Sequence, residues 1–258
     1  MTHYQVQAQN FSTQHENKIH SDAMAKRYGF AGALVPGVAV YGHLTYPLVK
    51  TQGPDWLSHA TVELKLRKPA YDGDLLDIEL TGSPNAQQQV QCHARNLLLA
   101  DITSQPLTAG QRANPPNALL DTEPKDPNRP TIAWNNLVPN QPFRSWNWHA
   151  GAVENESYCD QIRDGQSIYR NYVHPHWILS QANRALTREY LMPTWIHVGS
   201  RIHHYAPVMV GDDLVVQVLP TQKWRNKGHE FIKIYVAYRR GNLVTTEIEH
   251  TAIFQVAT

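Results

Sequence analysis

Apolar and polar positions alternate in several segments of the chain, most clearly behind a repeated Gly-Asp pair. The segments PAYDGDLLDIEL, from Pro69, and PVMVGDDLVVQV, from Pro207, share the pattern Pro-x-x-x-Gly-Asp-x-Leu-x-aliphatic-x-aliphatic. Gly-Asp favours a turn, and an apolar run of period two behind it is typical of a strand with one buried face. The pattern therefore predicts the same turn and strand twice.

Two other segments have helical patterns. In ALVPGVAVYGHLTYPLVK a helix is expected to begin near Gly37, because Pro36 stands at its start, where a missing N–H costs little. Pro47 is expected to end or kink this helix. A second helix is predicted near residue 175, where a mostly apolar stripe has helical spacing in Trp177, Ile178, Gln181, Ala182, Ala185 and Leu186.

The remaining alternating segments predict antiparallel strands. They are TVELKLRKP, DLLDIEL and QVQCHARNLLLADI in the first half, and RIHHYAPV, DLVVQVLP, HEFIKIYVAYRR and VTTEIEHTAIFQV in the second. A long apolar helix followed by such strands suggests a sheet wrapped around the helix. Two units of this kind can pair edge to edge and form one continuous sheet.

The two halves match at a constant offset, which indicates an internal duplication. The segments STQHENKIHSD (12–22) and AGAVENESYCD (150–160) share a Glu-Asn pair and a final Asp, with 154 − 16 = 138, 155 − 17 = 138 and 160 − 22 = 138. The Gly-Asp segments give 207 − 69 = 138 as well. A further pair, NLLLADI and NLVTTEI, matches at 146, as expected if the second copy carries a longer preceding strand.

A proline-rich segment separates the copies. Eight of the 17 prolines fall between Pro106 and Pro142, in a stretch with neither helical nor strand periodicity. We therefore divide the chain into a first unit at 1–105 that carries the candidate site, a linker at 106–144, and a second unit at 145–258 with a degenerate site.

Composition narrows the class of protein. A chain of 258 residues that is 41% hydrophobic and 17% charged is typical of a soluble globular protein. The formal charge of +1 predicts no binding to nucleic acid or acidic membranes. Cys92 and Cys159 are too few for a disulfide framework, and neither a secretory leader nor a membrane span is recognised, so a cytoplasmic location is expected.

The order of these segments resembles the double-hotdog proteins related to MaoC-type (R)-specific enoyl-CoA hydratases. The resemblance rests on NKIHSDAMAKRYGFAGALVPGV in the first copy and on PTWIHVGSRIHHYAPVMVGDDL, KGHEFIKIYV and EIEHTAIF in the second. It implies an α+β fold, a tandem hotdog in which each unit is a long helix wrapped by an antiparallel sheet. A pseudo-twofold axis is expected to relate the two units.

The family motif reads Gly-Asp-x-Asn-Pro-aliphatic-His, in which Asp and His are the catalytic pair. Residues 14–20 here read QHENKIH, so Asn17, Ile19 and His20 match the motif. Gln14 replaces Gly, Lys18 replaces Pro, and His15 stands in place of the catalytic Asp.

The resemblance implies hydration or dehydration of an acyl thioester of coenzyme A or of a carrier protein. His20 would be the general base, and Asn17 would orient it or donate to the substrate. His15 could move a proton but could not supply the negative charge of the missing carboxylate. Backbone N–H groups of Gly37 and Val38 would hold the thioester oxygen, and Trp177 would form a ligand wall. No cofactor or metal is expected, and a homodimer is left open.

The duplication suggests one active site and one relic. At offset 138 the counterparts of His15 and His20 are Val153 and Tyr158, neither of which suits a base at neutral pH. A pocket is therefore expected beside His20 and Gly37, and the equivalent place near Tyr158 is expected to be filled. The simpler interpretation of Glu16, Asn17 and Asp22 is a shared loop shape, with Asp22 as a helix N-cap.

Three functions remain open from sequence. The first is a hydratase or dehydratase acting on an acyl thioester, the second is a thioesterase on the same fold, and the third is an acyl-binding protein without catalysis. Fold alone does not decide between them, because one fold supports several chemistries.

Overall fold

The computed structural model describes residues 2–13, 16–84, 86–108, 110–116 and 122–257. The first copy contains β1 (Thr2–Gln7), α1 (Asp22–Arg27), α2 (Gly37–Gln52), β2 (Ala60–Leu66), β3 (Leu75–Thr81), β4 (Gln88–Ala94) and β5 (Leu97–Pro106). The second copy contains β6 (Trp146–His149), α3 (Ala152–Gln161), α4 (Pro175–Glu189), β7 (Ile196–His204), β8 (Asp213–Asn226), β9 (His229–Arg240) and β10 (Leu243–Gln255). Short 3-10 turns lie at Lys18–His20, Gly53–Asp55 and Ser167–Arg170.

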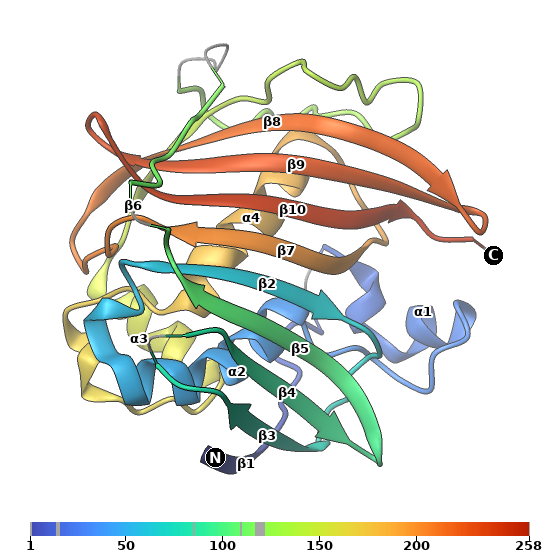
Figure 1. Ribbon diagram of the computed structural model, residues 1–258. Helices are drawn as coiled ribbons and strands as arrows, with labels where there is room; N and C mark the ends of the chain where they lie inside the picture. Colours follow the sequence, from blue (N-terminus) through green and yellow to red (C-terminus); the bar gives the residue numbers. More distant parts are fainter. Residues whose placement is uncertain (1, 14–15, 85, 109, 117–121, 258) are drawn as a thin grey trace.

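Across the described residues, ten strands form one sheet in the order β1-β3-β4-β5-β2-β7-β10-β9-β8-β6, as Figure 1 shows. The order is the same from either edge once β1 is matched with β6, β3 with β8, β4 with β9, β5 with β10 and β2 with β7. The predicted tandem of two hotdog units with pseudo-twofold symmetry is therefore confirmed.

The two copies join through antiparallel pairing of β2 with β7. Val62 lies opposite Ile202, and Leu64 lies opposite Ser200, so inward-facing side chains of β2 and β7 are direct neighbours where the two copies meet. Because the backbone ladder continues from one copy to the next, neither copy has a free sheet edge at this point.

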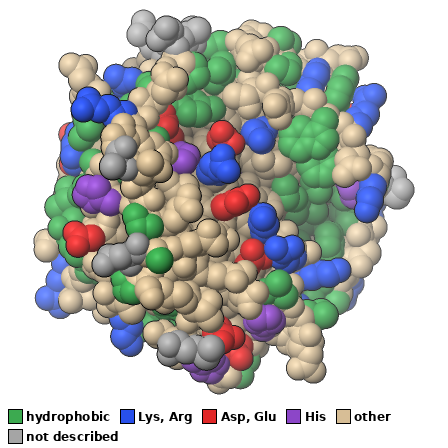
Figure 2. Space-filling view, in the orientation of Figure 1, with side chains coloured by type: hydrophobic (Ala, Val, Ile, Leu, Met, Phe, Trp, Pro, Cys, Tyr) green, Lys and Arg blue, Asp and Glu red, His purple; other side chains and the backbone are tan. Residues whose placement is uncertain are grey.

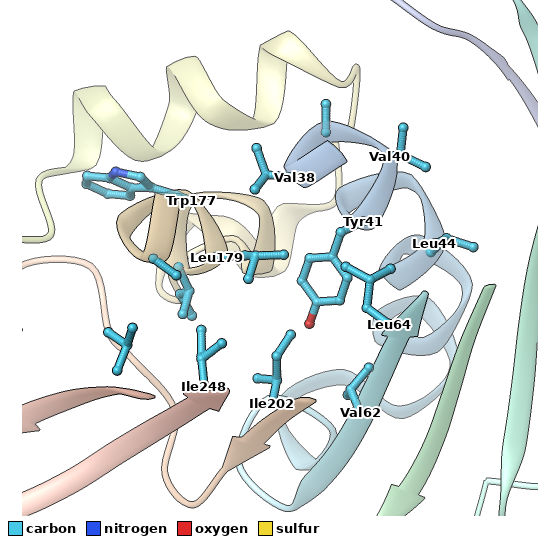
Figure 3. Packing of buried hydrophobic residues seen from close by; sticks show 14 of the residues in the cluster. Val38, Val40, Tyr41, Leu44, Val62, Leu64, Trp177, Leu179, Ile202 and Ile248 are labelled. Atoms are coloured by element: carbon cyan, nitrogen blue, oxygen red, sulfur yellow. The ribbon is translucent and has the colours of Figure 1, made fainter. Parts of the chain in front are cut away.

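Both long helices lie on the same face of the sheet (Figure 1), and the buried apolar side chains form the core between the helices and the sheet. Figure 3 shows Tyr41 of α2 and Leu179 of α4 directed toward Val62, Ile202 and Ile248 of the central strands. These side chains are buried, with Leu179, Val62 and Ile248 fully inaccessible. Removing the apolar surface of these side chains from water is the main stabilising contribution of packing a helix on a sheet.

Of the two predicted effects of Pro47, an end of α2 at this residue is wrong, because the helix continues to Gln52. A proline cannot donate to the carbonyl four residues earlier, which here is the oxygen of His43. The hydroxyl of Tyr4 in β1 donates to that oxygen at 2.8 Å instead. A tertiary hydrogen bond therefore replaces the one that the helix lacks.

The alternating pattern of QVQCHARNLLLADI predicted one strand, whereas the structure has two. The chain reverses between β4 and β5 at Arg95 and Asn96, whose φ angles are 51° and 59°. Positive φ at both central residues is the geometry of a tight two-residue hairpin. The outer strands β1 and β6 were not predicted either.

The outer face of the sheet mixes charges of both signs, as Figure 2 shows. Lys65 lies 3.8 Å from Glu63, and Lys233 lies 3.9 Å from Glu249, on the exposed side of the middle strands. Between β5 and β6, the described parts of residues 107–145 contain no helix or strand beyond isolated bridges such as Thr131 with Leu191.

Candidate active site

The loop before α1 is held in place by a buried asparagine. Asn17 caps the 3-10 turn at Lys18–His20, and its carboxamide donates to the carbonyl of Trp195 at 2.9 Å and accepts from the Trp195 N–H at 3.2 Å. Ile19 is buried in a small apolar cluster with Ala25 and Leu34. The turn is therefore fixed against the second copy just before β7 begins.

The same turn presents His20, which is half-buried. Its Nδ1 lies 2.7 Å from the carbonyl oxygen of Leu34. A carbonyl oxygen can only accept, so in the neutral ring Nδ1 carries the hydrogen and Nε2 carries the lone pair. The backbone thus selects the tautomer in which Nε2 can take a proton.

Helix α2 begins beside this histidine. Its first hydrogen bonds run from the N–H groups of Ala39 and Val40 to the Pro36 oxygen, so the N–H groups of Gly37 and Val38 precede the helical ladder. Such N–H groups carry the positive end of the helix dipole and suit a carbonyl oxygen or an oxyanion. A Cβ on Gly37 would lie 2.5 Å from Leu66 Cδ1 and 3.3 Å from His197 Nδ1, so glycine keeps this end of the helix accessible.

A cavity of about 400 Å³ opens at this place. Its wall includes His20, Gly37, Leu66, Asn183, His197 and Val256, and therefore draws on both copies. The sequence-predicted residues Asn17, His20 and Gly37 thus all line this cavity, whereas Val38 does not. Among the described residues that line it there is no Asp or Glu.

A second cavity of about 420 Å³ adjoins the first and shares His20, Pro36, Asn183 and Trp195 with it. Its other lining residues include Val38, Tyr158, His176, Ser180 and Arg184. The prediction that the space near Tyr158 would be filled is therefore wrong. The helix starts still differ, because Gly37 is half-buried and lines the first cavity, whereas its counterpart Pro175 is buried.

The prediction that Trp177 forms a ligand wall is also wrong. Trp177 is 3% exposed and lies outside the lining of either cavity next to His20. Its ring stacks on Tyr158 at 5.3 Å and meets Trp148 edge-on at 5.1 Å. Its position one turn into α4 places it under β6 and α3, where an aromatic residue completes the core.

The acidic residues of the motif segment have structural contacts. Glu16 pairs with the buried Arg129 of the linker. Asp22 is the first residue of α1 and follows Ser21, which occupies the N-cap, so the predicted N-cap role of Asp22 is wrong. Its carboxylate instead accepts from the Ala33 N–H at 2.8 Å. His15 lies outside the described residues.

In the second copy, the residues that correspond to the motif segment make structural contacts. Glu154 and Asn155 lie within α3 rather than in a loop, and Asn155 donates to the carbonyls of Tyr169 and Tyr172. His174 caps α4 through Nδ1 and contacts Asp164 through Nε2 at 3.2 Å. Burial lowers the pKa of His174, which keeps the capping nitrogen unprotonated.

Sequence reasoning missed His197, which lies on the wall of the first cavity. Its Nε2 is 2.9 Å from Ser200 Oγ, and Ser200 Oγ is 3.0 Å from His250 Nδ1. The ring is 7% exposed, and burial lowers its pKa to about 3. The available signal was the repeat, since 197 − 59 = 138 places His59 at the corresponding position of the first copy.

Among the described residues no group of three or more His, Cys, Asp and Glu side chains could hold a metal ion. No described helix combines the length and the apolar character needed to cross a membrane.

Comparisons with known proteins give structural relatives. No family model and no curated protein sequence matches the chain. A protein named as a MaoC domain dehydratase from Chloroflexus aurantiacus superposes with a TM-score of 0.64 at 10% identity, over 99% of this chain and 94% of that one. A conserved hypothetical protein from Mycobacterium tuberculosis, described as having a double hotdog fold, gives 0.65 at 13% identity, over 98% and 96%.

A protein named as an oleoyl thioesterase from Lactobacillus plantarum gives a TM-score of 0.54 at 10% identity, over 98% of this chain and 96% of that one. At such identities the likeness establishes the fold and leaves the chemistry to the site itself. The chain has the double hotdog fold, and its structural neighbours include MaoC-like dehydratases.

Proposed function

We propose that this chain is an acyl-thioester enzyme of the hydratase or dehydratase type, with His20 as its general base. The observation that carries the proposal is the place of His20 beside the start of α2. Its Nδ1 is held by the Leu34 oxygen, and the ring lines a cavity that also contains the start of α2. A positioned base next to helix N–H groups is what addition of water to a conjugated thioester requires.

In the hydration direction, His20 Nε2 takes a proton from water while the oxygen bonds to the β-carbon. The negative charge that develops on the thioester oxygen is stabilised by the N–H groups of Gly37 and Val38. The imidazolium of His20 then gives its proton to the α-carbon, which restores the base. The net change is one water added across the double bond, and dehydration is the reverse. The acyl group would be carried by coenzyme A or by a carrier protein.

A thioesterase is the second candidate. It is favoured by the thioesterase among the structural neighbours and by the lack of a described Asp or Glu on the first cavity. In that reaction the water activated by His20 would attack the thioester carbonyl and release a free thiol. Cys159 is not suited to act as a nucleophile, because burial raises the pKa of its thiol to about 12.

The test uses crotonyl-CoA with the parent protein, with His20→Ala and with His59→Ala as a matched control on an exposed histidine. We expect loss of the enoyl absorbance without free thiol, and a decrease of roughly 10²–10⁴ in turnover for His20→Ala, the usual range for a positioned proton-transfer group. The control should retain parental turnover.

Release of free thiol would instead identify the thioesterase. Tight binding of the acyl thioester with neither reaction would identify an acyl-binding protein without catalysis. Hydration that persists at parental rate in His20→Ala would contradict the assignment of the base.

A further inference from the structure

The second cavity presents a charged side chain that the proposed reaction does not use. Four residues of α4 with i, i+3, i+4, i+7 spacing lie on one face of the helix and line this cavity: Ser180, Asn183, Arg184 and Thr187. Arg184 is exposed, so its guanidinium is accessible to a ligand that enters the cavity. The polar face of α4 therefore places a positive charge on the cavity wall.

The charge of Arg184 is not matched by a carboxylate in the described part of the chain. Its side-chain hydrogen bond runs to Gln181 Oε1, a neutral acceptor, at a long 3.5 Å. No Asp or Glu is among the described residues that line the cavity. An accessible arginine without an ionic partner, on the wall of a cavity, indicates a site for an anion.

A second arginine adds to the positive charge at this end of α4. Arg188, one turn beyond Arg184, donates to the backbone carbonyl of Glu123 at 3.1 Å, whereas the Glu123 carboxylate pairs with Arg144 at 3.3 Å. Burial and, after it, the charge of Arg184 lower the pKa of the Arg188 guanidinium. The two arginines of α4 therefore repel each other, and an anion beside Arg184 would reduce that repulsion.

The first copy has no charged residue at the corresponding place. Since 184 − 46 = 138 and 180 − 42 = 138, Tyr46 of α2 corresponds to Arg184, and Gly42 corresponds to Ser180. Gly42 is packed so closely that an added Cβ would lie 2.7 Å from Ile162 Cδ1. The same helix face is thus closed by packing in one copy and opens on a cavity in the other. The fold itself does not require an arginine at this position.

We propose that the second cavity is a binding site for a carboxylate group, which Arg184 holds. A guanidinium donates two parallel hydrogen bonds to a carboxylate, and one arginine matches its single charge, whereas a phosphate group carries more. Phe11, Val38 and Trp195 also line the cavity and suit a hydrocarbon chain on the same ligand. Because the two cavities share His20, the carboxylate is either that of a free acid or the far end of an acyl group that extends from the first cavity.

The test compares hexanoate with hexanamide, its neutral counterpart, by isothermal titration calorimetry. The parent should bind hexanoate at least about tenfold more tightly, since hydrogen bonds between charged groups are the stronger ones. Arg184→Gln should remove this preference, and Arg170→Gln, the matched control at an exposed arginine outside both cavities, should retain it. Equal binding of the two probes by the parent, binding of neither, or an unchanged preference in Arg184→Gln would overturn the proposal.

A second comparison identifies the source of the carboxylate. Adipoyl-CoA and hexanoyl-CoA are titrated into His20→Ala, so that neither is converted, with and without Arg184→Gln. Tighter binding of adipoyl-CoA that depends on Arg184 would assign the carboxylate to the acyl group. Equal binding of the two thioesters, with the hexanoate preference intact, would assign it to a free acid. The site does not depend on the proposed reaction: a parent protein that neither hydrates crotonyl-CoA nor releases thiol would overturn the proposed function and leave the carboxylate site standing.

Discussion

At the scale of single residues, buried polar side chains divide into those that hold backbone and those that face a cavity. Asn17 and Asn155 occupy corresponding positions of the two copies, and both are buried with carboxamides bonded to backbone groups. His20 and His197 line the first cavity. The matching asparagines favour a role for Asn17 in supporting the loop under His20.

The structural role of Asn17 gives the first prediction. Asn17→Ala leaves the N–H and the carbonyl of Trp195 without their partner, so the free energy of unfolding should decrease by about 2–3 kcal/mol. Asn155→Ala should have a similar effect, since it also removes bonds to buried backbone. Urea denaturation measures both. Unchanged stability together with lost turnover in Asn17→Ala would instead show that Asn17 acts on the substrate.

Buried histidines also predict how stability depends on pH. His204 is 1% exposed, neither ring nitrogen has a partner among the described residues, and burial lowers its pKa from 6.5 to about 3. Between these pH values the unfolded chain therefore binds a proton at His204 that the folded chain does not bind. The free energy of unfolding should decrease as pH falls below about 6.5, by up to about 1.4 kcal/mol per pH unit for one such group.

Replacing this residue tests the assignment. His204→Leu should flatten the dependence of the unfolding free energy on pH between about 6.5 and 4, and should not destabilise the protein at neutral pH, because no hydrogen bond is removed. Some dependence should remain, since burial also lowers the pKa of His43 to about 4. Parallel curves for the variant and the parent would show that His204 is protonated in the folded state.

At the scale of elements, helix α2 continues through Pro47, and β1 supplies a donor to the carbonyl that Pro47 leaves without its helical partner. Sequence patterns predicted the starts of α2 and α4 well, since proline at a helix start and apolar spacing are local signals. They could not predict that α2 would continue, because the Tyr4 hydroxyl comes from a strand 39 residues before His43. Whether a helical carbonyl that faces a proline finds another donor depends on the tertiary structure.

The Tyr4 contact gives a prediction of coupling. Tyr4→Phe removes the donor to the His43 oxygen and should lower the free energy of unfolding by about 1–2 kcal/mol. In a Pro47→Ala background the N–H restored at position 47 can donate to the same oxygen, so the additional cost of Tyr4→Phe should become small. A double-mutant cycle from denaturation curves measures this difference. Strictly additive effects would contradict the replacement of one donor by the other.

At the scale of the whole molecule, the pseudo-twofold arrangement places one copy's helix start against the other copy's strand. The repeat at offset 138 was sufficient to predict two similar units, because duplicated patterns fold alike, and the continuous sheet that the structure shows was one way in which such units can pair. It was not sufficient to predict the wall of the cavity, where Gly37 meets His197 across 160 positions of chain, as 197 − 37 = 160. Trp177 was misplaced for the same reason, since its neighbours Trp148 and Tyr158 belong to elements that the sequence did not place.

We propose above all that the first cavity holds an acyl thioester between His20 and the start of α2. The most direct measurement is a crystal structure with butyryl-CoA, which has no double bond to hydrate. We expect the thioester oxygen within hydrogen-bonding distance of the Gly37 or Val38 N–H, with the acyl carbons beside the His20 ring. An acyl group bound beside Tyr158 and His176, with its carbonyl turned away from α2, would contradict it.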